Sequence, residues 1–316
     1  MHDAALSSTR KPPKTDGEKA VLAATANPIS PDGHPPPVAT LKAPDGTKLG
    51  ERPFVMGVLN VTPDSFSDGG DFMGEAAVDR AQALADAGAD VIDVGAESTR
   101  PGSEGVPPEE QLTRLSCVFE QIVAIGLPVS IDTMSATVAG WALERGAVMV
   151  NDVSACRADP GMAALVAGRG CPVVLMHMLG QPGTMQRDPS YPKGVVEEVV
   201  AFLRGRVRAV RRAGVRSEQV ILDPGIGFGK TVAHNLELIR ELRKLKGLGY
   251  PVLVGPSRKW FIGQITGAPA RERLAGSVAT AVASVLAGAD MVRVHDVAET
   301  VPAVRVASAI MRGAWP

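Results

Sequence analysis

Most short apolar runs in this sequence end in side chains that can bind ligands or exchange protons. Carboxylates, amides, hydroxyls and cations follow the runs. Asp, Ser, Thr and Asn in such places often only cap the next helix, and for any one of them capping explains the residue as well as function does. The side chains concerned are Asn60, Thr62, Asp64, Glu97-Ser98-Thr99-Arg100, Asp132-Thr133, Asn151-Asp152, His177, Asp223, Ser257-Arg258-Lys259, Arg293 and His295.

Four basic side chains in this set are not explained by capping. Arg100, Lys259, Arg293 and His295 follow apolar runs, but positive charge is unfavourable near a helix N-terminus. Arg293 and His295 are two residues apart, so on one strand their side chains point the same way. Arginine and lysine that gather at one place usually bind an anion, and most often a phosphate group. The sequence therefore predicts an anionic ligand.

Strands and helices must bring these residues together, and the apolar pattern from residue 54 onward predicts both. Short apolar runs alternate with longer stretches of helical periodicity, which is typical of a parallel sheet covered by helices. We expect strands at 54–59, 91–94, 129–131, 148–150, 173–176, 220–222, 252–254 and 292–294. We expect helices at 75–87, 109–125, 136–145, 195–213, 235–246 and 274–287.

Eight such strands favour a closed (β/α)8 TIM barrel over an open, doubly wound sheet. The open sheet would have a glycine-rich phosphate loop after its first strand, whereas Gly57, Gly69 and Gly70 lack the GxGxxG spacing. In a barrel the carboxyl ends of all strands share one rim. The polar residues above would therefore converge although they are distant in sequence.

The composition is that of a soluble globular protein. Of 316 residues, 45% are hydrophobic and 21% are charged, and the formal net charge is −1. This balance gives no reason to expect a nucleic-acid or anionic-membrane partner, and no apolar run approaches the ~18 residues of a membrane span. Cys117, Cys156 and Cys171 are far apart and lie in or beside apolar segments. We therefore expect buried free thiols and a cytoplasmic location.

Residues 1–50 differ from the rest of the chain. They are rich in proline between Pro12 and Pro37 and show little periodicity, as in segments that cannot bury a core. We expect a mostly disordered N-terminal extension at 1–50, with no core contribution from residues 1 to about 45, and one barrel domain at 51–316. Asp45-Gly46 suits a tight turn that would close a small hairpin before the barrel.

Two long motifs resemble signatures of the dihydropteroate synthases. They are MGVLNVTPDSFSDGG at 56–70 and GAESTRPG at 95–102; DPGIGFGK at 223–230, SRK at 257–259 and RVHD at 293–296 also match, in family order. The resemblance runs from about residue 53 to the C-terminus. It implies a barrel-fold transferase of folate biosynthesis, which condenses 6-hydroxymethyl-7,8-dihydropterin pyrophosphate with 4-aminobenzoate and releases pyrophosphate.

The resemblance also implies roles around the pterin. Asp223 would accept hydrogen bonds from the amino group and a ring N–H of the pterin in a bidentate fork. Asn151 would bind neighbouring ring atoms, Asp132 would reach a second edge, and Lys259 would bind the ring carbonyl. Met176 would form an apolar floor under the ring, although a methionine on a core strand is about as often plain packing.

Pyrophosphate would be bound by Arg293 and His295, with further contacts from Thr99 and Arg100. Asn60 resembles the family's Mg2+ ligand, with water and phosphate oxygens completing the coordination. Departure of pyrophosphate would leave positive charge on the pterin, and the neutral amine of 4-aminobenzoate would then attack without a strong base. The resemblance thus gives catalytic roles to Asp132, Arg293, His295 and Lys259.

The second substrate needs an aromatic slot and an anchor for its carboxylate. Phe228 and Pro101 would sandwich the ring of 4-aminobenzoate. Ser257 and the N–H groups that follow it would bind the carboxylate at a helix N-terminus. Sulfonamides, which mimic 4-aminobenzoate, would bind the same slot. Trp260 occupies a position where we would expect a small or polar residue, and it should lie on the outside of its helix.

Two other functions stay open at this point. One is a pterin-binding methyltransferase, against which Thr99-Arg100, Arg293 and His295 argue because they suit pyrophosphate. The other is a non-catalytic paralogue that only binds pterin, against which the intact motifs argue. The apolar helices at 274–287 and 301–311 could pair two copies or simply cover the barrel, and the resemblance favours a homodimer.

Overall fold

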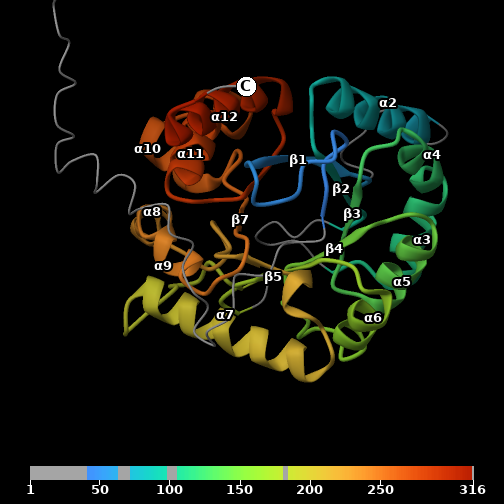
Figure 1. Ribbon diagram of the computed structural model, residues 1–316, viewed down its shortest axis with the longest axis horizontal. Helices are drawn as coiled ribbons and strands as arrows, with labels where there is room; N and C mark the ends of the chain where they lie inside the picture. Colours follow the sequence, from blue (N-terminus) through green and yellow to red (C-terminus); the bar gives the residue numbers. More distant parts are fainter. Residues whose placement is uncertain (1–40, 63–71, 98–104, 181–183, 315–316) are drawn as a thin grey trace, which may run out of the picture.

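The computed structural model describes residues 41–62, 72–97, 105–180 and 184–314. Within these ranges, parallel strands form a central ring and the helices surround it (Figure 1). The sheet order is β6-β5-β4-β3-β2-β1-β8-β7, and a parallel bridge between Leu222 and Val252 closes the ring. The (β/α)8 barrel is therefore confirmed, and the open doubly wound sheet is excluded.

The strands extend slightly beyond the predicted apolar runs. The sheet hydrogen bonds continue past the last apolar residue, so that Asn60, Asp132 and Asp223 are the final residues of their strands. This places each polar side chain at the rim on a rigid element. The strands are β1 (Phe54–Asn60), β2 (Val91–Gly95), β3 (Val129–Asp132), β4 (Met149–Asp152), β5 (Val173–Met176), β6 (Val220–Asp223), β7 (Leu253–Val254) and β8 (Met291–Val294).

The helices follow the predicted pattern with two breaks. The stretch 109–125 is divided because Val118 leaves the helical region at φ −132° and is buried, and 235–246 is divided at Glu241. Among the described residues, no helix is long and apolar enough to cross a membrane. The helices are α2 (Phe72–Asp86), α3 (Pro108–Ser116), α4 (Phe119–Ala124), α5 (Ala136–Glu144), α6 (Met162–Arg169), α7 (Val195–Arg212), α8 (Val232–Arg240), α9 (Leu242–Lys246), α10 (Trp260–Thr266), α11 (Leu274–Leu286) and α12 (Val297–Arg312).

Alternate residues of the strands point into the barrel and form two layers. Side chains near the amino ends are apolar, and two residues further along several strands the inward side chains are polar. We call the first set the apolar layer: Phe54, Met56, Val91, Met149, Val174, Ile221, Leu253 and Met291. We call the second set the polar layer: Asp93, Asp132, Asn151, Asp223 and Arg293.

A small hairpin closes the barrel beneath the apolar layer. Lys42 and Lys48 pair in antiparallel fashion, and Gly46 in the turn between them has φ 84°, as Asp45-Gly46 predicts. Leu41 and Ala43 are buried against the apolar layer. The expectation that residues 1 to about 45 add nothing to the core is therefore wrong for these two residues, because the open lower end of a barrel needs an apolar cover. The boundary at residue 50 stays a prediction.

The cysteines are free, but they are not all buried. Cys156 and Cys171 are buried as predicted, and burial raises the pKa of their thiols to about 12 and about 11. Cys117 is exposed. The prediction of burial is wrong there because Cys117 ends α3 at its solvent face, while the next residue, Val118, turns inward.

Candidate active site

A cavity of about 670 Å³ opens at the carboxyl ends of the strands. This volume is in the range of small-molecule sites. Thr99, Arg100 and Pro101 lie outside the described residues, as does Asp64. Every other residue to which the resemblance gives a role in binding or catalysis lines the cavity: Asn60, Asp132, Asn151, Met176, Asp223, Phe228, Ser257, Lys259, Arg293 and His295. Of the other polar residues expected at the rim, Thr62, Thr133, Asp152 and His177 do not line it.

Arg293 of β8 joins two carboxylates from neighbouring strands. Its Nε lies 2.6 Å from Asp93 Oδ2 and its Nη2 lies 2.7 Å from Asp132 Oδ2. The amide of Asn151 also donates to Asp93 Oδ2, at 2.9 Å. Buried charges are tolerated when they are paired in this way. The network fixes the floor of the cavity, since each of its members is anchored on a strand.

Asp93 was missed by the sequence reasoning, which treated 91–94 as one apolar run. The residue is fully buried, and among the described residues its Oδ1 has no hydrogen-bond partner. A carboxylate inside an otherwise apolar strand was the available signal, because such a charge needs a partner across the barrel. Its partner, Arg293, had been assigned to an anionic ligand alone.

Burial perturbs the protonation of Asp132. Desolvation raises the pKa of its carboxyl group to about 7, and the nearby carboxylates of Asp93, Glu97 and Asp152 act in the same direction. Arg293 opposes the rise. Desolvation lowers the pKa of Arg293, but its ion pairs with Asp93 and Asp132 outweigh this effect and raise the pKa, so the guanidinium stays charged. Asp132 therefore changes charge near neutral pH.

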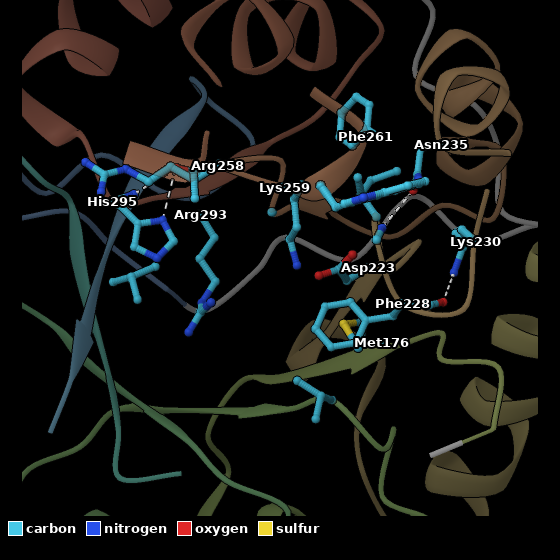
Figure 2. Close-up of a pocket in the computed structure, with 18 of the residues that line it drawn as sticks. Met176, Asp223, Phe228, Lys230, Asn235, Arg258, Lys259, Phe261, Arg293 and His295 are labelled. Carbon is cyan, nitrogen blue, oxygen red and sulfur yellow. Dashed lines mark hydrogen bonds between the residues drawn. The ribbon is translucent and has the colours of Figure 1, made fainter. Parts of the chain in front are cut away.

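Asp223 lies between two lysines at the end of β6 (Figure 2). Its Oδ1 accepts a hydrogen bond from the amide of Gly225 at 2.6 Å. Burial raises the pKa of its carboxyl group to about 6, which Lys259, Lys230 and Arg293 partly offset. At neutral pH this group is a buried acceptor that faces the cavity. Lys259 Nζ lies 4.2 Å from the ring centre of Phe228, a distance typical of a cation–π contact.

His295 forms a pair with Ser257. Its Nδ1 lies 3.0 Å from Ser257 Oγ, and its backbone N–H donates to the same oxygen at 3.2 Å. Burial and then Arg293 lower the pKa of the imidazole to about 3, so it is neutral at pH 7. When the serine hydroxyl donates to Nδ1, the proton of the imidazole is on Nε2. The expectation that His295 adds positive charge is not met in this arrangement; it adds a neutral donor.

The segment after Ser257 differs from the expected helix N-terminus. The amide of Arg258 already donates to Ser277 Oγ at 2.9 Å, and the amide of Lys259 donates to Pro256 O at 3.4 Å. These two N–H groups are therefore not free for a carboxylate. Trp260, in the first turn of α10, is 53% exposed and lies at the edge of the cavity, so its predicted outward position is confirmed.

Comparison with known proteins identifies the family. A family model described as "pterin binding enzyme" matches residues 56–295. A dihydropteroate synthase of Synechocystis is 45% identical over 287 residues, which cover 89% of this chain and 97% of that protein. This chain belongs to the dihydropteroate synthase family. Membership agrees with the motifs at 56–70 and 95–102 that carried the resemblance.

Solved structures of dihydropteroate synthases have the same fold. The enzyme of Xanthomonas albilineans with 4-aminobenzoic acid is 46% identical, has a TM-score of 0.79, and covers 87% of this chain and 98% of its own. The enzyme of Yersinia pestis in a sulfonamide drug complex is 42% identical, has a TM-score of 0.80, and covers 87% of this chain and 99% of its own.

Two more residues of the cavity in this member of the dihydropteroate synthase family were not predicted. Lys230 and Asn235 line the cavity and are both buried. Asn235 Oδ1 accepts from the amide of Gly227 at 2.7 Å, and Lys230 Nζ donates to Phe228 O at 2.9 Å. Their signal in the sequence is weak, since a lysine after a glycine-rich turn is usually solvated.

Proposed function

We propose that this chain is a dihydropteroate synthase that condenses 6-hydroxymethyl-7,8-dihydropterin pyrophosphate with 4-aminobenzoate to give 7,8-dihydropteroate and pyrophosphate. One observation carries this proposal beyond family membership. Asp223, a buried carboxylate, faces a cavity that also presents donors from Asn151 and Lys259. A pterin edge with two N–H donors and a neighbouring carbonyl complements such a set.

The pterin subsite is formed by the polar layer and the residues above it. The carboxylate of Asp223 accepts from the amino group and ring N–H, and Lys259 donates to the ring carbonyl. Asn151 binds neighbouring ring atoms through an amide that Asp93 orients at 2.9 Å. Met176, which is buried beside Phe228, supplies an apolar floor.

Departure of pyrophosphate separates opposite charges, and the site offers groups for both. Asp132, whose Oδ2 lies 2.7 Å from Nη2 of Arg293, stabilises positive charge that develops on the pterin. Arg293 and the neutral imidazole of His295 donate to the departing oxygens. The amine of 4-aminobenzoate is already neutral, so its attack needs no strong general base.

Asn60 is the residue that would bind Mg2+ in this site. Its amide is at the rim end of β1 and lines the cavity, and amide oxygen is a hard donor that suits this ion. Among the described residues, no group of three or more His, Cys, Asp or Glu could bind a metal. The donor set therefore fits an ion that is completed by water and phosphate oxygens. When bound, Mg2+ would offset the negative charge of the leaving group.

The 4-aminobenzoate subsite uses Phe228 and Ser257. The ring of Phe228 supplies an aromatic face next to the ammonium of Lys259. The Ser257 hydroxyl can turn its hydrogen from His295 Nδ1 to the carboxylate of the substrate, because the oxygen already accepts from the His295 amide. Sulfonamides, which resemble this substrate in shape and charge, occupy the same place.

A pyrophosphate-release assay tests the proposal. The purified chain is given the pterin pyrophosphate and Mg2+, with and without 4-aminobenzoate. We expect steady release that depends on 4-aminobenzoate. A methyltransferase or a non-catalytic pterin-binding protein would release no pyrophosphate with either mixture, and that result would overturn the proposal.

We also propose a homodimer that forms through α11 and α12. These helices contact each other on the outside of the barrel, and Val306, Ile310 and Met311 of α12 are 51–68% exposed. Adjacent exposed apolar side chains often mark an interface. Light scattering at micromolar concentration should give twice the 32.9 kDa mass of the chain; a monomeric mass would contradict the proposed dimer.

We further propose a cytoplasmic location, because the free cysteines fit a reducing compartment.

A further inference from the structure

Lys230 is a buried cationic residue for which the mechanism above gives no role. Its side chain is 1% exposed and lies beside Asp223 and Phe228 (Figure 2). Its Nζ contacts three neutral acceptors: Phe228 O at 2.9 Å, His177 Nδ1 at 3.0 Å and His177 O at 3.5 Å. A lysine is rarely buried to this degree unless its donors are satisfied. The hydrogen bonds to these acceptors must therefore offset the free-energy cost of removing the Lys230 side chain from water.

The three acceptors match the three N–H donors of an ammonium group. Burial lowers the pKa of His177 to about 2, so its ring is neutral and can accept through Nδ1. Burial also lowers the pKa of Lys230 to about 7, and Asp223 acts in the opposite direction. As a neutral amine, Lys230 could still donate to both carbonyls and accept from Nδ1–H. The contacts can therefore persist on both sides of neutral pH.

These contacts fix one side of the loop from Gly225 to Gly229. The loop lies directly against the segment after β5, because a Cβ atom at Gly225 would lie 1.9 Å from His177 O and one at Gly229 would lie 2.7 Å from Leu179 Cβ. Both glycines have positive φ, at 68° and 64°. Only glycine allows this approach, and the close packing brings the backbone of the loop within reach of Lys230.

Other buried groups hold the remaining positions of the loop. Asn235 Oδ1 accepts from Gly227 N at 2.7 Å, and Tyr191 donates its hydroxyl to Gly229 O at 2.8 Å. Lys230 holds the position between them, the carbonyl of Phe228. The ring of Phe228 thereby faces Lys259, and the amide of Gly225 faces Asp223.

We propose that Lys230 is a positioning residue that serves both substrate subsites: it anchors the Phe228 carbonyl, and its ammonium supports the ionised form of Asp223. The proposal rests on the function proposed above. The charged groups around Asp223 are Lys259 before α10, Arg293 of β8 and Lys230 itself. Lys230 is the one of these that does not point at the substrate, because its donors are turned to His177 and Phe228.

The test compares three variants with the wild type in the pyrophosphate-release assay and in calorimetric titration with a pterin ligand from pH 5 to 8. Lys230→Met removes the anchor and the charge. Asn235→Ala removes an anchor of the same loop but no charge. Lys246→Met is the matched control, because Lys246 forms an ion pair with Asp290 at 2.6 Å, among residues that do not line the cavity.

Lys230→Met should raise the KM for 4-aminobenzoate about tenfold, as expected for loss of a charge-assisted hydrogen bond. Pterin affinity should fall at low pH as Asp223 becomes protonated, and we call this part of the pH profile the acid limb. Lys230→Met should move the acid limb to higher pH, because Asp223 loses a positive neighbour. Asn235→Ala should raise the same KM without moving the limb. Lys246→Met should change neither quantity, even if it lowers the thermal midpoint.

Two results would overturn the proposal. One is a Lys230→Met variant that loses stability but keeps the wild-type KM and pH profile, since Lys230 would then only support the fold. The other is an equal pH shift in Lys246→Met. If Lys230→Met does not fold, Lys230→Gln takes its place: it keeps a donor for the Phe228 carbonyl, so the pH shift should remain, and an unmoved limb would contradict the charge role. A wild type that releases no pyrophosphate would instead refute the proposed function.

Discussion

The apolar layer and the polar layer lie on the same strands but do opposite things. Met149 and Asn151 are two residues apart on β4, and Ile221 and Asp223 are two residues apart on β6. All four are buried. Burial of Met149 and Ile221 stabilises the fold because apolar side chains leave water. Burial of Asn151 and Asp223 costs hydration free energy, which is offset only by hydrogen bonds to other groups.

The comparison shows where this barrel trades stability for binding. In the apolar layer the side chains pack against one another and need no ligand to satisfy them. In the polar layer Asp93 Oδ1 lacks a partner among the described residues, and burial raises the pKa of Asp132 and Asp223. A ligand that donates to these acceptors would relieve part of this cost. Substitutions in the two layers should therefore separate stability from affinity.

The largest effect should follow Asp223→Asn. The amide keeps the shape but presents an NH2 donor to a ligand edge made of donors, so pterin affinity should fall by about 2–5 kcal/mol. The free energy of unfolding should not fall, because the variant removes a buried charge. Calorimetric titration measures the affinity, with Ile221→Val on the same strand as the control. A loss of less than tenfold would contradict the role of Asp223.

The opposite result, a loss of stability without a loss of affinity, should follow Met149→Ala. Its side chain is fully buried in the apolar layer, and truncation of such a side chain costs about 2–5 kcal/mol of unfolding free energy. Pterin affinity of the folded protein should stay the same. Denaturant unfolding and titration with a pterin ligand are both carried out on Met149→Ala and Asn151→Ala, since the first variant should lose stability and the second should lose affinity. Equal loss of affinity in both would mean that the layers do not act separately.

The sequence allowed the strands and the rim residues to be predicted, but not the contacts that link them across the barrel. Strand positions followed from apolar periodicity, and the rim residues followed from motifs at the strand ends. Asp93 was hidden because it lies inside an apolar run, and its partner Arg293 is 200 positions away along the chain. Lys230 was hidden because burial of a lysine depends on acceptors from another segment, here His177. Such partnerships are tertiary: a charge inside an apolar run indicates that a partner exists, but the local pattern does not indicate which residue it is.

A smaller effect should appear with pH, and it should have opposite signs for stability and affinity. Folding raises the pKa of Asp132 from 3.8 to about 7. Its stabilising contribution is therefore complete below the unfolded pKa and is lost as pH rises through about 7. Pterin affinity should instead rise through about pH 6, because Asp223 must be ionised to accept.

Thermal midpoints of the wild type and Asp132→Asn from pH 4 to 8 check the first sign. The difference between the two proteins should narrow at low pH, where Asp132 is protonated and resembles the amide. Titration with a pterin ligand over the same range checks the second sign. Stability and affinity that rise together would show that the two carboxyl groups do not titrate separately.

The smallest effect should come from shortening the chain, and it locates the lower edge of the apolar layer. Residues 1–40 have the composition of a segment without a core, so their removal should change the free energy of unfolding by less than about 0.5 kcal/mol.

Removal of residues 1–50 also takes away Leu41, Ala43 and Leu49, which are buried against Phe54 and Met56. Each leucine lost from such a place costs about 1.5–3 kcal/mol of burial, so this second truncation should lower the thermal midpoint clearly while leaving the polar layer in place. Pterin affinity should then be retained by both truncated forms at a temperature where both are folded. A stability loss already present in the 41–316 form would mean that residues before Leu41 also cover the barrel, and unchanged stability in the 51–316 form would mean that the hairpin does not close it.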